Sequence, residues 1–360
     1  MLHHVALVYG AGAPFYYVEP PINDPLAYLI LLVFVLVNQS WFMGAFFLLA
    51  GYFTPGSFHR KGPGSFLKDR LLRLGIPLII FYFVLSPVAS IGFWQMPASL
   101  TGITTPLTWQ AYPHLLGMGP LWFVAMLLIF DFGYAVWQML TRNRTSDLMS
   151  KSSLPSYLLI GVFILALALA SYLVRIVVPI GKEVLDFPTL AYLPQYLSFF
   201  VLGTVASRHD WFRTLPRSMG VVGFVIAVVA AVALFPIAFI SLLISLENGS
   251  QQLPPYGYGT WQSAVYTLWD STFAVGMVLG LIPLFRRFFN GQGRFGRFLS
   301  QHSYAVYVIH IPIVVFLAYA LRGIELAALL KFGMAAVIGV PLCFAVAYIV
   351  RRIPGVSRVL

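Results

Sequence analysis

The sequence predicts an all-α polytopic membrane protein with about ten transmembrane helices. Of its 360 residues, 60% are hydrophobic and only 9% are charged, whereas a soluble domain is about half apolar and a quarter charged. Stretches of about twenty residues without a charge recur along the chain, and each can cross a hydrocarbon core about 30 Å thick. A membrane β-barrel would instead alternate apolar and polar residues along short segments.

The predicted elements follow one another with short connections. A short apolar piece, residues 1–9, would be the outer half of a first helix whose inner half is absent, and a loop rich in Gly, Pro and Tyr follows it. Because no later loop exceeds about 25 residues, we expect one integral membrane domain over residues 1–360. Its complete spans are expected near residues 26–53, 74–95, 119–140, 154–178, 190–207, 219–246, 262–285, 303–321 and 324–350.

The basic residues predict the orientation of these spans. Loops 54–73, 141–153, 208–218 and 286–302 and the C-terminal tail hold five, three, three, four and three Lys or Arg residues, together 18 of 22. Basic residues concentrate in cytoplasmic loops. We therefore expect a multi-pass protein of the cytoplasmic (inner) cell membrane with a cytoplasmic C-terminus. Basic residues in cytoplasmic loops explain the net charge of +11, so membrane lipids and not nucleic acid are the expected partners.

Several classes of site are excluded by composition and motif. The single cysteine, Cys343, permits neither a disulfide framework nor a thiolate metal site. The chain contains no P-loop and no HExxH pattern, and no metal is expected. Any chemistry must therefore come from side chains on the helices and short loops.

Ionisable groups inside the spans are candidates for function because their burial in a membrane is costly. Asp131, Asp270 and His310 are such residues. For the two aspartates a packing role and a functional role are equally favoured, whereas the polar cluster 38–40 more simply packs between helices. One functional alternative is a transporter or flippase for an anionic or amphipathic solute, with Asp131, Asp270 and His310 as its relay.

A polar stripe marks the span that begins near residue 303. Ser303, Tyr307 and His310 are four and three residues apart, so they share one helical face. A polar stripe on an apolar span faces a bundle interior or a wet cavity. This stripe enters from the cytoplasmic side.

Two arginines mark the same side of the membrane. Arg70 and Arg73 are three residues apart at the start of a span, and their guanidinium groups can hold phosphate oxygens in pairs. The alternative is orientation and contact with anionic lipid headgroups, which the residues alone favour. Arg60 and Lys61 are assigned to orientation only.

His3 and His4 lie in the apolar piece at the N-terminus. Histidine is the most common general base near neutral pH. The residues alone favour a terminal, partly disordered pair.

Five segments resemble a known family. They read FFLLAGYFTP at 46–55, FLKDRLLRLGIP at 66–77, GPLWFVAML at 119–127, QYLSFFVLGTVA at 195–206 and SYAVYVIHIPIVV at 303–315. In this order and at these span ends, they resemble the acyltransferase-3 group of integral membrane acyltransferases. That group includes polysaccharide O-acetylases and the succinyl transferase of periplasmic glucans.

The resemblance implies ten spans with both ends cytoplasmic. It also implies O-acylation, in which an acetyl or succinyl type of group passes from a cytoplasmic acyl-CoA to a hydroxyl of an extracytoplasmic glycan or lipid-linked sugar. Acyl-CoA would be a co-substrate, and no bound cofactor is implied.

The resemblance also assigns roles to residues. His4 is the best match to the family's motif histidine and His3 the second, so His4 would be the base or would carry the acyl group. The arginine of that motif would lie eleven residues before His4, ahead of Met1, so an inactive truncated homologue is a further alternative. Arg70 and Arg73 match the family's donor-binding pair. The remaining candidates for substrate contact or oxyanion stabilisation are Trp122, Tyr304, Tyr307, His310 and Asp270.

Overall fold

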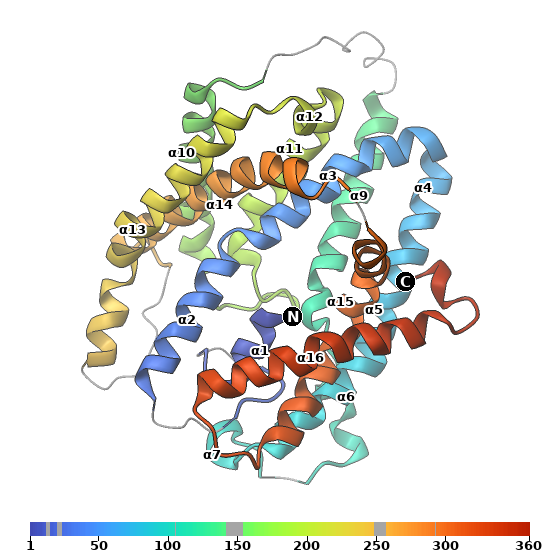
Figure 1. Cartoon of the computed structure of the whole chain (residues 1–360), viewed down its shortest axis with the longest axis vertical. Coiled ribbons are helices and arrows are strands. Elements are labelled where there is room, and N and C mark those ends of the chain that lie inside the picture. Colours follow the sequence, from blue (N-terminus) through green and yellow to red (C-terminus); the bar gives the residue numbers. More distant parts are fainter. Residues whose placement is uncertain (12–14, 20–23, 105, 142–153, 248–256, 292) are drawn as a thin grey trace. The chain divides into compact units, whose positions relative to one another are not determined.

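The computed structural model describes residues 1–11, 15–19, 24–104, 106–141, 154–247, 257–291 and 293–360. The predicted loop residues Arg142, Arg144 and Lys151 lie outside these ranges. Within them the regular elements are helices and no strand occurs (Figure 1). Large apolar side chains stay exposed along the helices, Leu158 at 79% and Val232 at 72%, as expected where lipid covers them.

Nine helical stretches in the described ranges are long and apolar enough to cross a membrane. The predicted class, an all-α polytopic membrane protein, is therefore confirmed. A seven-residue helix, α1 (Leu2–Val8), precedes them. The nine stretches are Pro25–Lys61, Pro63–Gln95, Trp109–Thr141, Tyr157–Val177, Leu190–Arg208, Arg217–Ile240, Trp261–Phe288, Arg294–Leu321 and Ala328–Arg351.

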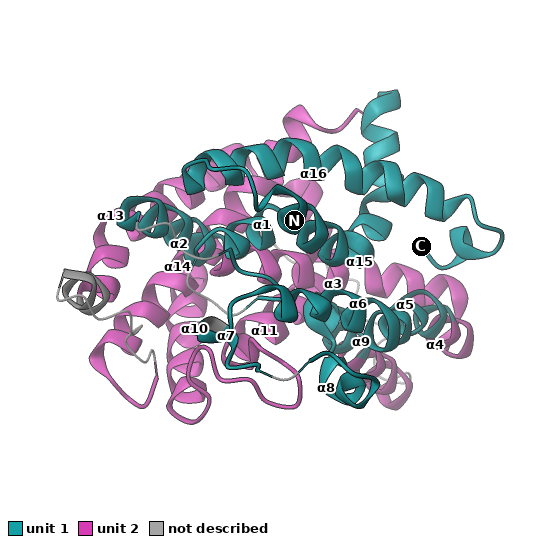
Figure 2. Ribbon diagram, turned by 90° about the horizontal axis from the view of Figure 1, so that it is seen from below, with its two compact units in different colours: residues 1–38, 69–128, 292–360 teal, residues 39–68, 129–291 magenta. Residues whose placement is uncertain are grey.

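The chain forms two compact units, each built from separate segments of sequence (Figure 2). Unit 1 contains residues 1–38, 69–128 and 292–360, and unit 2 contains residues 39–68 and 129–291. The helices of unit 1 are α1, α2 (Pro25–Gln39), the π-helix Leu71–Gly75, α5 (Ile76–Ile80), the π-helix Phe81–Leu85, α6 (Ser86–Ser90), α7 (Ala98–Thr101), α8 (Tyr112–Leu115), α15 (Arg294–Leu321) and α16 (Ala328–Arg351).

Unit 2 holds most of the remaining helices. Helix α9 begins in unit 1 and continues into unit 2, and the end of α4 belongs to unit 1. These helices are α3 (Phe42–Lys61), α4 (Pro63–Arg70), α9 (Trp122–Thr141), α10 (Tyr157–Val177), α11 (Leu193–Arg208), α12 (Trp211–Thr214), α13 (Arg217–Glu247) and α14 (Trp261–Phe288).

Prolines set the form of the stretch that carries Arg73. An α-helix would bond the Arg73 carbonyl to the N–H of residue 77, but residue 77 is proline and has no N–H. The hydroxyl of Tyr304 donates to this carbonyl at 2.8 Å. The same occurs one segment later, where Tyr112 donates at 2.6 Å to the carbonyl of Phe83, four residues before a second proline. A helix with interior prolines is thereby kept in place by tyrosines from its neighbours.

Helix α15 positions several of the predicted site residues of unit 1. Its residues Ala305 and Val306 form a buried cluster with Cys343 and Ala347 of α16, and Met1 packs against the cluster. On α1, residues 5–8 are buried. The N-terminal helix is therefore packed into unit 1, which argues against a terminal, partly disordered pair of histidines.

Candidate active site

Two histidines from distant parts of the chain meet in unit 1. Nδ1 of His4, on α1, lies 2.7 Å from Nε2 of His310, on α15. The ring centroids are 4.9 Å apart and the ring planes differ by 26°. His310 is only 2% exposed, and its Nδ1 donates to the main-chain carbonyl of Tyr307 at 2.7 Å. The pattern of the sequence identified both residues but not their contact.

One face of α15 runs from this pair towards the start of the helix. It carries a stripe of Tyr304, Tyr307 and His310 at intervals of three residues, with neighbouring ring centroids 6.4 and 6.2 Å apart. Tyr304 takes the place of the predicted Ser303, which is exposed and bonds the Leu299 carbonyl of its own helix. At a rise of about 1.5 Å per residue, His310 lies about 9 Å beyond Tyr304 along the axis. Since Tyr304 bonds the Arg73 carbonyl, the stripe joins the main chain of the predicted donor-binding pair to the histidine pair.

The two tyrosine hydroxyls of the stripe are bonded to the main chain. Tyr304 donates to the Arg73 carbonyl, and Tyr307 donates to the Pro120 carbonyl. Each phenol has one hydrogen to donate, so in this arrangement neither points it at a substrate oxygen. Their oxyanion role stays a prediction.

Trp122 lies beside the same stripe. It is 7% exposed at the start of α9, and its ring is 6.4 Å from that of Phe123 in an edge-to-face arrangement. Phe123 in turn makes an edge-to-face contact with Tyr307 at 6.3 Å. The predicted residues Trp122, Tyr307, His310 and His4 therefore belong to one contiguous set in unit 1.

Arg70 and Arg73 lie at the junction of α4 and the π-helix Leu71–Gly75. Arg73 Nε lies 3.3 Å from Asp69 Oδ1, and the Arg73 side chain is 60% exposed. An exposed pair of this kind contributes little stability and leaves guanidinium N–H groups that can reach an anion. Short π-helical segments also recur at functional sites.

A short segment of the first loop covers the histidines, and sequence reasoning missed it. The Phe15 ring lies nearly parallel to that of His4, with centroids 5.5 Å apart.

Further along this loop, Glu19 pairs with the buried Lys331 of α16, and the N–H of Glu19 bonds the carbonyl of Val8. Burial raises the pKa of the Tyr17 phenol, and the Glu19 carboxylate raises it further. A lysine within a span was the available signal, because a buried lysine needs a partner.

His3 is held differently from His4. The side-chain amide nitrogen of Asn38 lies 3.3 Å from Nδ1 of His3, which therefore accepts its hydrogen. The His3 and His4 rings meet edge to face at 5.4 Å. Of the two candidate histidines, His4 is the one bonded to His310.

Asp270 belongs to unit 2, where it forms a buried ion pair. Its Oδ2 lies 2.6 Å from Nη2 of Arg175, and both side chains are at most 2% exposed. The Arg175 guanidinium also lies 4.6 Å from the centroid of the Tyr192 ring and 5.0 Å from that of Tyr266. Arg175 lies within the predicted span 154–178, but sequence reasoning did not identify it as the partner of Asp270. The available signal was a lone aspartate in an apolar span, because a buried aspartate needs a cationic partner.

Asp131 is also in unit 2 and has a neutral neighbour. The Thr54 hydroxyl donates to its Oδ1 at 2.9 Å, and Asp131 is completely buried. Asp131 and Asp270 thus have different partners on different helices. Among the described residues, no group of three or more His, Cys, Asp or Glu side chains could hold a metal ion.

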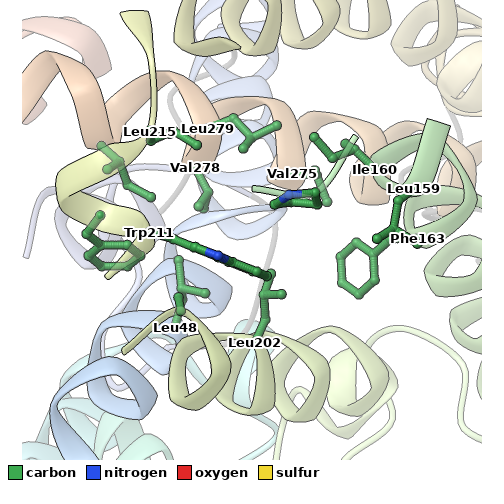
Figure 3. Close-up of a pocket in the computed structure, with 14 residues that line it drawn as sticks. Leu48, Leu159, Ile160, Phe163, Leu202, Trp211, Leu215, Val275, Val278 and Leu279 are labelled. Atoms are coloured by element: carbon green, nitrogen blue, oxygen red, sulfur yellow. The ribbon is translucent and has the colours of Figure 1, made fainter. Parts of the chain in front are cut away.

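Unit 2 also contains an apolar cavity of about 280 Å³ (Figure 3). Its lining comes from α3, α10, α11, α12 and α14 and includes Leu48, Phe163, Leu202, Trp211 and Val278. Apart from the indole nitrogen of Trp211, which lies within its ring, the labelled side chains are hydrocarbon (Figure 3). Among the described residues, those that line the cavity offer no acid, base or nucleophile.

Comparison with protein-family models matches residues 1–352 to the acyltransferase domain of acyltransferase family 3. No curated protein and no solved structure matched the chain. The family match covers nearly the whole sequence, and the nine candidate spans of the described ranges agree with a protein that crosses the membrane many times. The resemblance predicted from the motifs is confirmed: the chain belongs to acyltransferase family 3 and is a multi-pass membrane acyltransferase.

Proposed function

We propose that the protein moves an acetyl or succinyl type of acyl group from a cytoplasmic acyl-CoA to a hydroxyl of an extracytoplasmic glycan or glycolipid. The protein would lie in the cytoplasmic (inner) membrane with its C-terminus in the cytoplasm. The acceptor would be a free glycan or a lipid-linked sugar. This proposal specifies the donor, the acceptor and the direction of the family's reaction.

One observation carries the proposal: the stripe on α15 connects the Arg73 main chain with the His4–His310 pair. An acyl-CoA presents phosphates at one end and a thioester at the other, joined by an extended arm. Arginines suit the phosphates, and a histidine suits the reacting end. The arrangement supports a donor that lies along α15.

The chemistry needs one base. His4 takes the proton of the acceptor hydroxyl while the hydroxyl oxygen attacks the thioester carbonyl carbon. The C–S bond then breaks, and the leaving thiolate takes the proton from His4. In the second order of events, His4 is acylated first and passes the group to the acceptor. A burst of acyl-enzyme before steady turnover distinguishes the second order from the first.

The contacts of the relay residues favour acyl transfer over solute transport. Asp270 is neutralised by Arg175, and His310 donates to a main-chain carbonyl, which has no hydrogen to give and is not protonated near neutral pH. A proton cannot pass along that bond. Solute flux that is independent of acyl-CoA would support the transporter alternative.

The test uses purified protein in vesicles, labelled acetyl-CoA or succinyl-CoA, and a panel of glycan acceptors. Transfer of label and release of free CoA thiol are measured. Loss of the base in His4→Ala should lower transfer by about 100-fold or more. Equal transfer by His4→Ala and the unchanged protein would remove His4 from the mechanism.

The donor site is tested separately. Arg70→Ala and Arg73→Ala should each raise the KM for acyl-CoA about tenfold, the cost of a lost charge-assisted hydrogen bond. Arg60→Ala is the control, because Arg60 is an exposed arginine at the end of α3 and is assigned to orientation only. A similar rise for Arg60→Ala would mean that general positive charge, and not the pair, attracts the donor.

A further inference from the structure

The hydrogen bonds of the histidine pair have a defined direction. The carbonyl of Tyr307 can only accept, so Nδ1 of His310 carries a hydrogen and donates it. The second nitrogen of His310 then has two options. It is either a lone-pair acceptor in a neutral ring or a second N–H in a positively charged ring.

Burial decides between these options. His310 is 2% exposed, and the carboxylates with ion pairs in the described ranges are paired with Arg73, Arg175, Arg213 or Lys331 and not with His310. An unpaired cation inside a membrane protein is very costly. The His310 ring is therefore neutral, and its Nε2 accepts the hydrogen that His4 donates from Nδ1.

We propose that His310 is a positioning residue that fixes His4 in the Nδ1–H form, so that Nε2 of His4 is the basic atom of the active site. The role in the reaction rests on the proposed function. The tautomer itself rests on the two hydrogen bonds, each 2.7 Å long, and on the burial of His310.

The ring of His4 is also held in its plane. The Phe15 ring is nearly parallel to it, with centroids 5.5 Å apart, and the planes of the His4 and His310 rings differ by 26°. When Nε2 takes the acceptor proton, Nδ1–H keeps its bond to the lone pair of His310, which stabilises the new charge. The chain of bonds ends at a carbonyl that cannot take the proton. The proton therefore stays on Nε2 until the leaving sulfur removes it.

Two substitutions of His310 separate positioning from packing. His310→Gln keeps an acceptor oxygen near the place of Nε2, whereas His310→Asn keeps only a donor near the place of Nδ1 for the Tyr307 carbonyl. We expect Gln to retain transfer within about tenfold and Asn to lose about 100-fold, the range seen when an orienting partner is removed. A purely structural anchor for the carbonyl would give the opposite order.

His302 provides the matched control. It lies on the same helix, is 7% exposed, and its Nδ1 donates to the Phe298 carbonyl at 2.7 Å. His302→Gln and His302→Asn should leave transfer unchanged. A loss at His302 as large as that at His310 would overturn the proposal.

Nitrogen-15 NMR of histidine-labelled protein provides a readout that does not depend on activity. We expect the His4 signals, identified by their loss in His4→Gln, to show a protonated Nδ1 and an unprotonated Nε2. A hydrogen on Nε2 would overturn the proposal. If no acyl-CoA supports transfer by the unchanged protein, the proposed function fails, while this measurement still decides the tautomer.

Discussion

Arg175 and Asp270 show how a charge is kept inside a membrane-spanning helix. Each side chain is almost completely buried, and the pair is closed by a bond of 2.6 Å. Two tyrosine rings lie within 5.0 Å of the guanidinium carbon. Their negatively polarised faces favour a cation. The charges of Arg175 and Asp270 therefore compensate each other, and neither charge would be compensated without its partner.

Removing one member of this pair should destabilise unit 2. Arg175→Met or Asp270→Leu alone leaves an uncompensated buried charge, which costs about 3–5 kcal/mol. The double variant removes both charges and should recover most of that loss. Midpoints of thermal unfolding in detergent measure all three. A double variant less stable than either single variant would contradict this account.

Sequence reasoning found candidate residues but not the contacts between them. His4, His310 and Asp270 were identified, but the contact of His4 with His310 and the partner of Asp270, Arg175, were not. Arg175 lies in the predicted span 154–178, two residues before the end of α10, but nothing in that span pointed to Asp270 as its partner. A contact between residues 4 and 310 depends on how distant helices pack. Periodicity within one helix contains no information about that packing.

Helices α3 and α11 approach each other closely through glycines. A Cβ added at Gly51 would lie 2.1 Å from the Phe200 carbonyl oxygen, and one added at Gly203 would lie 2.2 Å from that of Leu48. These contacts are with backbone atoms, which cannot rotate away. Small residues at helix crossings are typical of membrane proteins.

Gly51→Ala should therefore destabilise the protein by about 1–3 kcal/mol or more, because the two helices must separate. The control is Gly56→Ala on the same helix, where nothing lies within 4 Å of the added carbon. That change should be neutral or stabilise by about 0.5–1 kcal/mol, since alanine favours the helix. Unfolding midpoints in detergent compare the two. Equal effects would mean that the close approach does not limit stability.

Two buried basic residues, Arg175 and Lys331, change how the charge pattern of the whole molecule is counted. Four basic residues lay outside the loops expected in the cytoplasm: Arg175, Lys182, Arg322 and Lys331. Arg175 and Lys331 are paired with acidic residues inside their units. In the predicted orientation they therefore add no positive charge to the outer surface, and the imbalance between the two sides is larger than the count suggests.

Cysteine labelling tests the orientation. Cys343 is buried, and replacing it with serine gives a background without thiols. Ser65 and Ser357 are exposed at the expected cytoplasmic side, and Thr108 is exposed at the other. In intact cells a membrane-impermeant maleimide should label Thr108→Cys only, and after permeabilisation all three. Labelling of Ser357→Cys in intact cells would contradict a cytoplasmic C-terminus.

At the scale of the whole molecule, composition and motif order were sufficient to predict the fold class and the family. Hydrophobic length identifies spans because every backbone polar group in a bilayer must be bonded within its own helix. The division into two units could not be predicted in this way. Unit 1 joins residues 1–38 with residues 292–360, and such pairings arise from packing between distant segments.

The stripe on α15 fixes the distance between the Arg73 backbone and the histidine pair. Tyr304 holds the Arg73 backbone and His310 holds His4, and both lie on one continuous helix. One residue inserted between them would turn the far end by about 100° and advance it by about 1.5 Å. The distance between the Arg73 backbone and His4 is thus set by the rise of one helix and not by a loop. In the proposed reaction, α15 fixes the distance between the arginines and the histidines. A donor with a shortened arm could contact the arginines or reach the histidines, but not both at once.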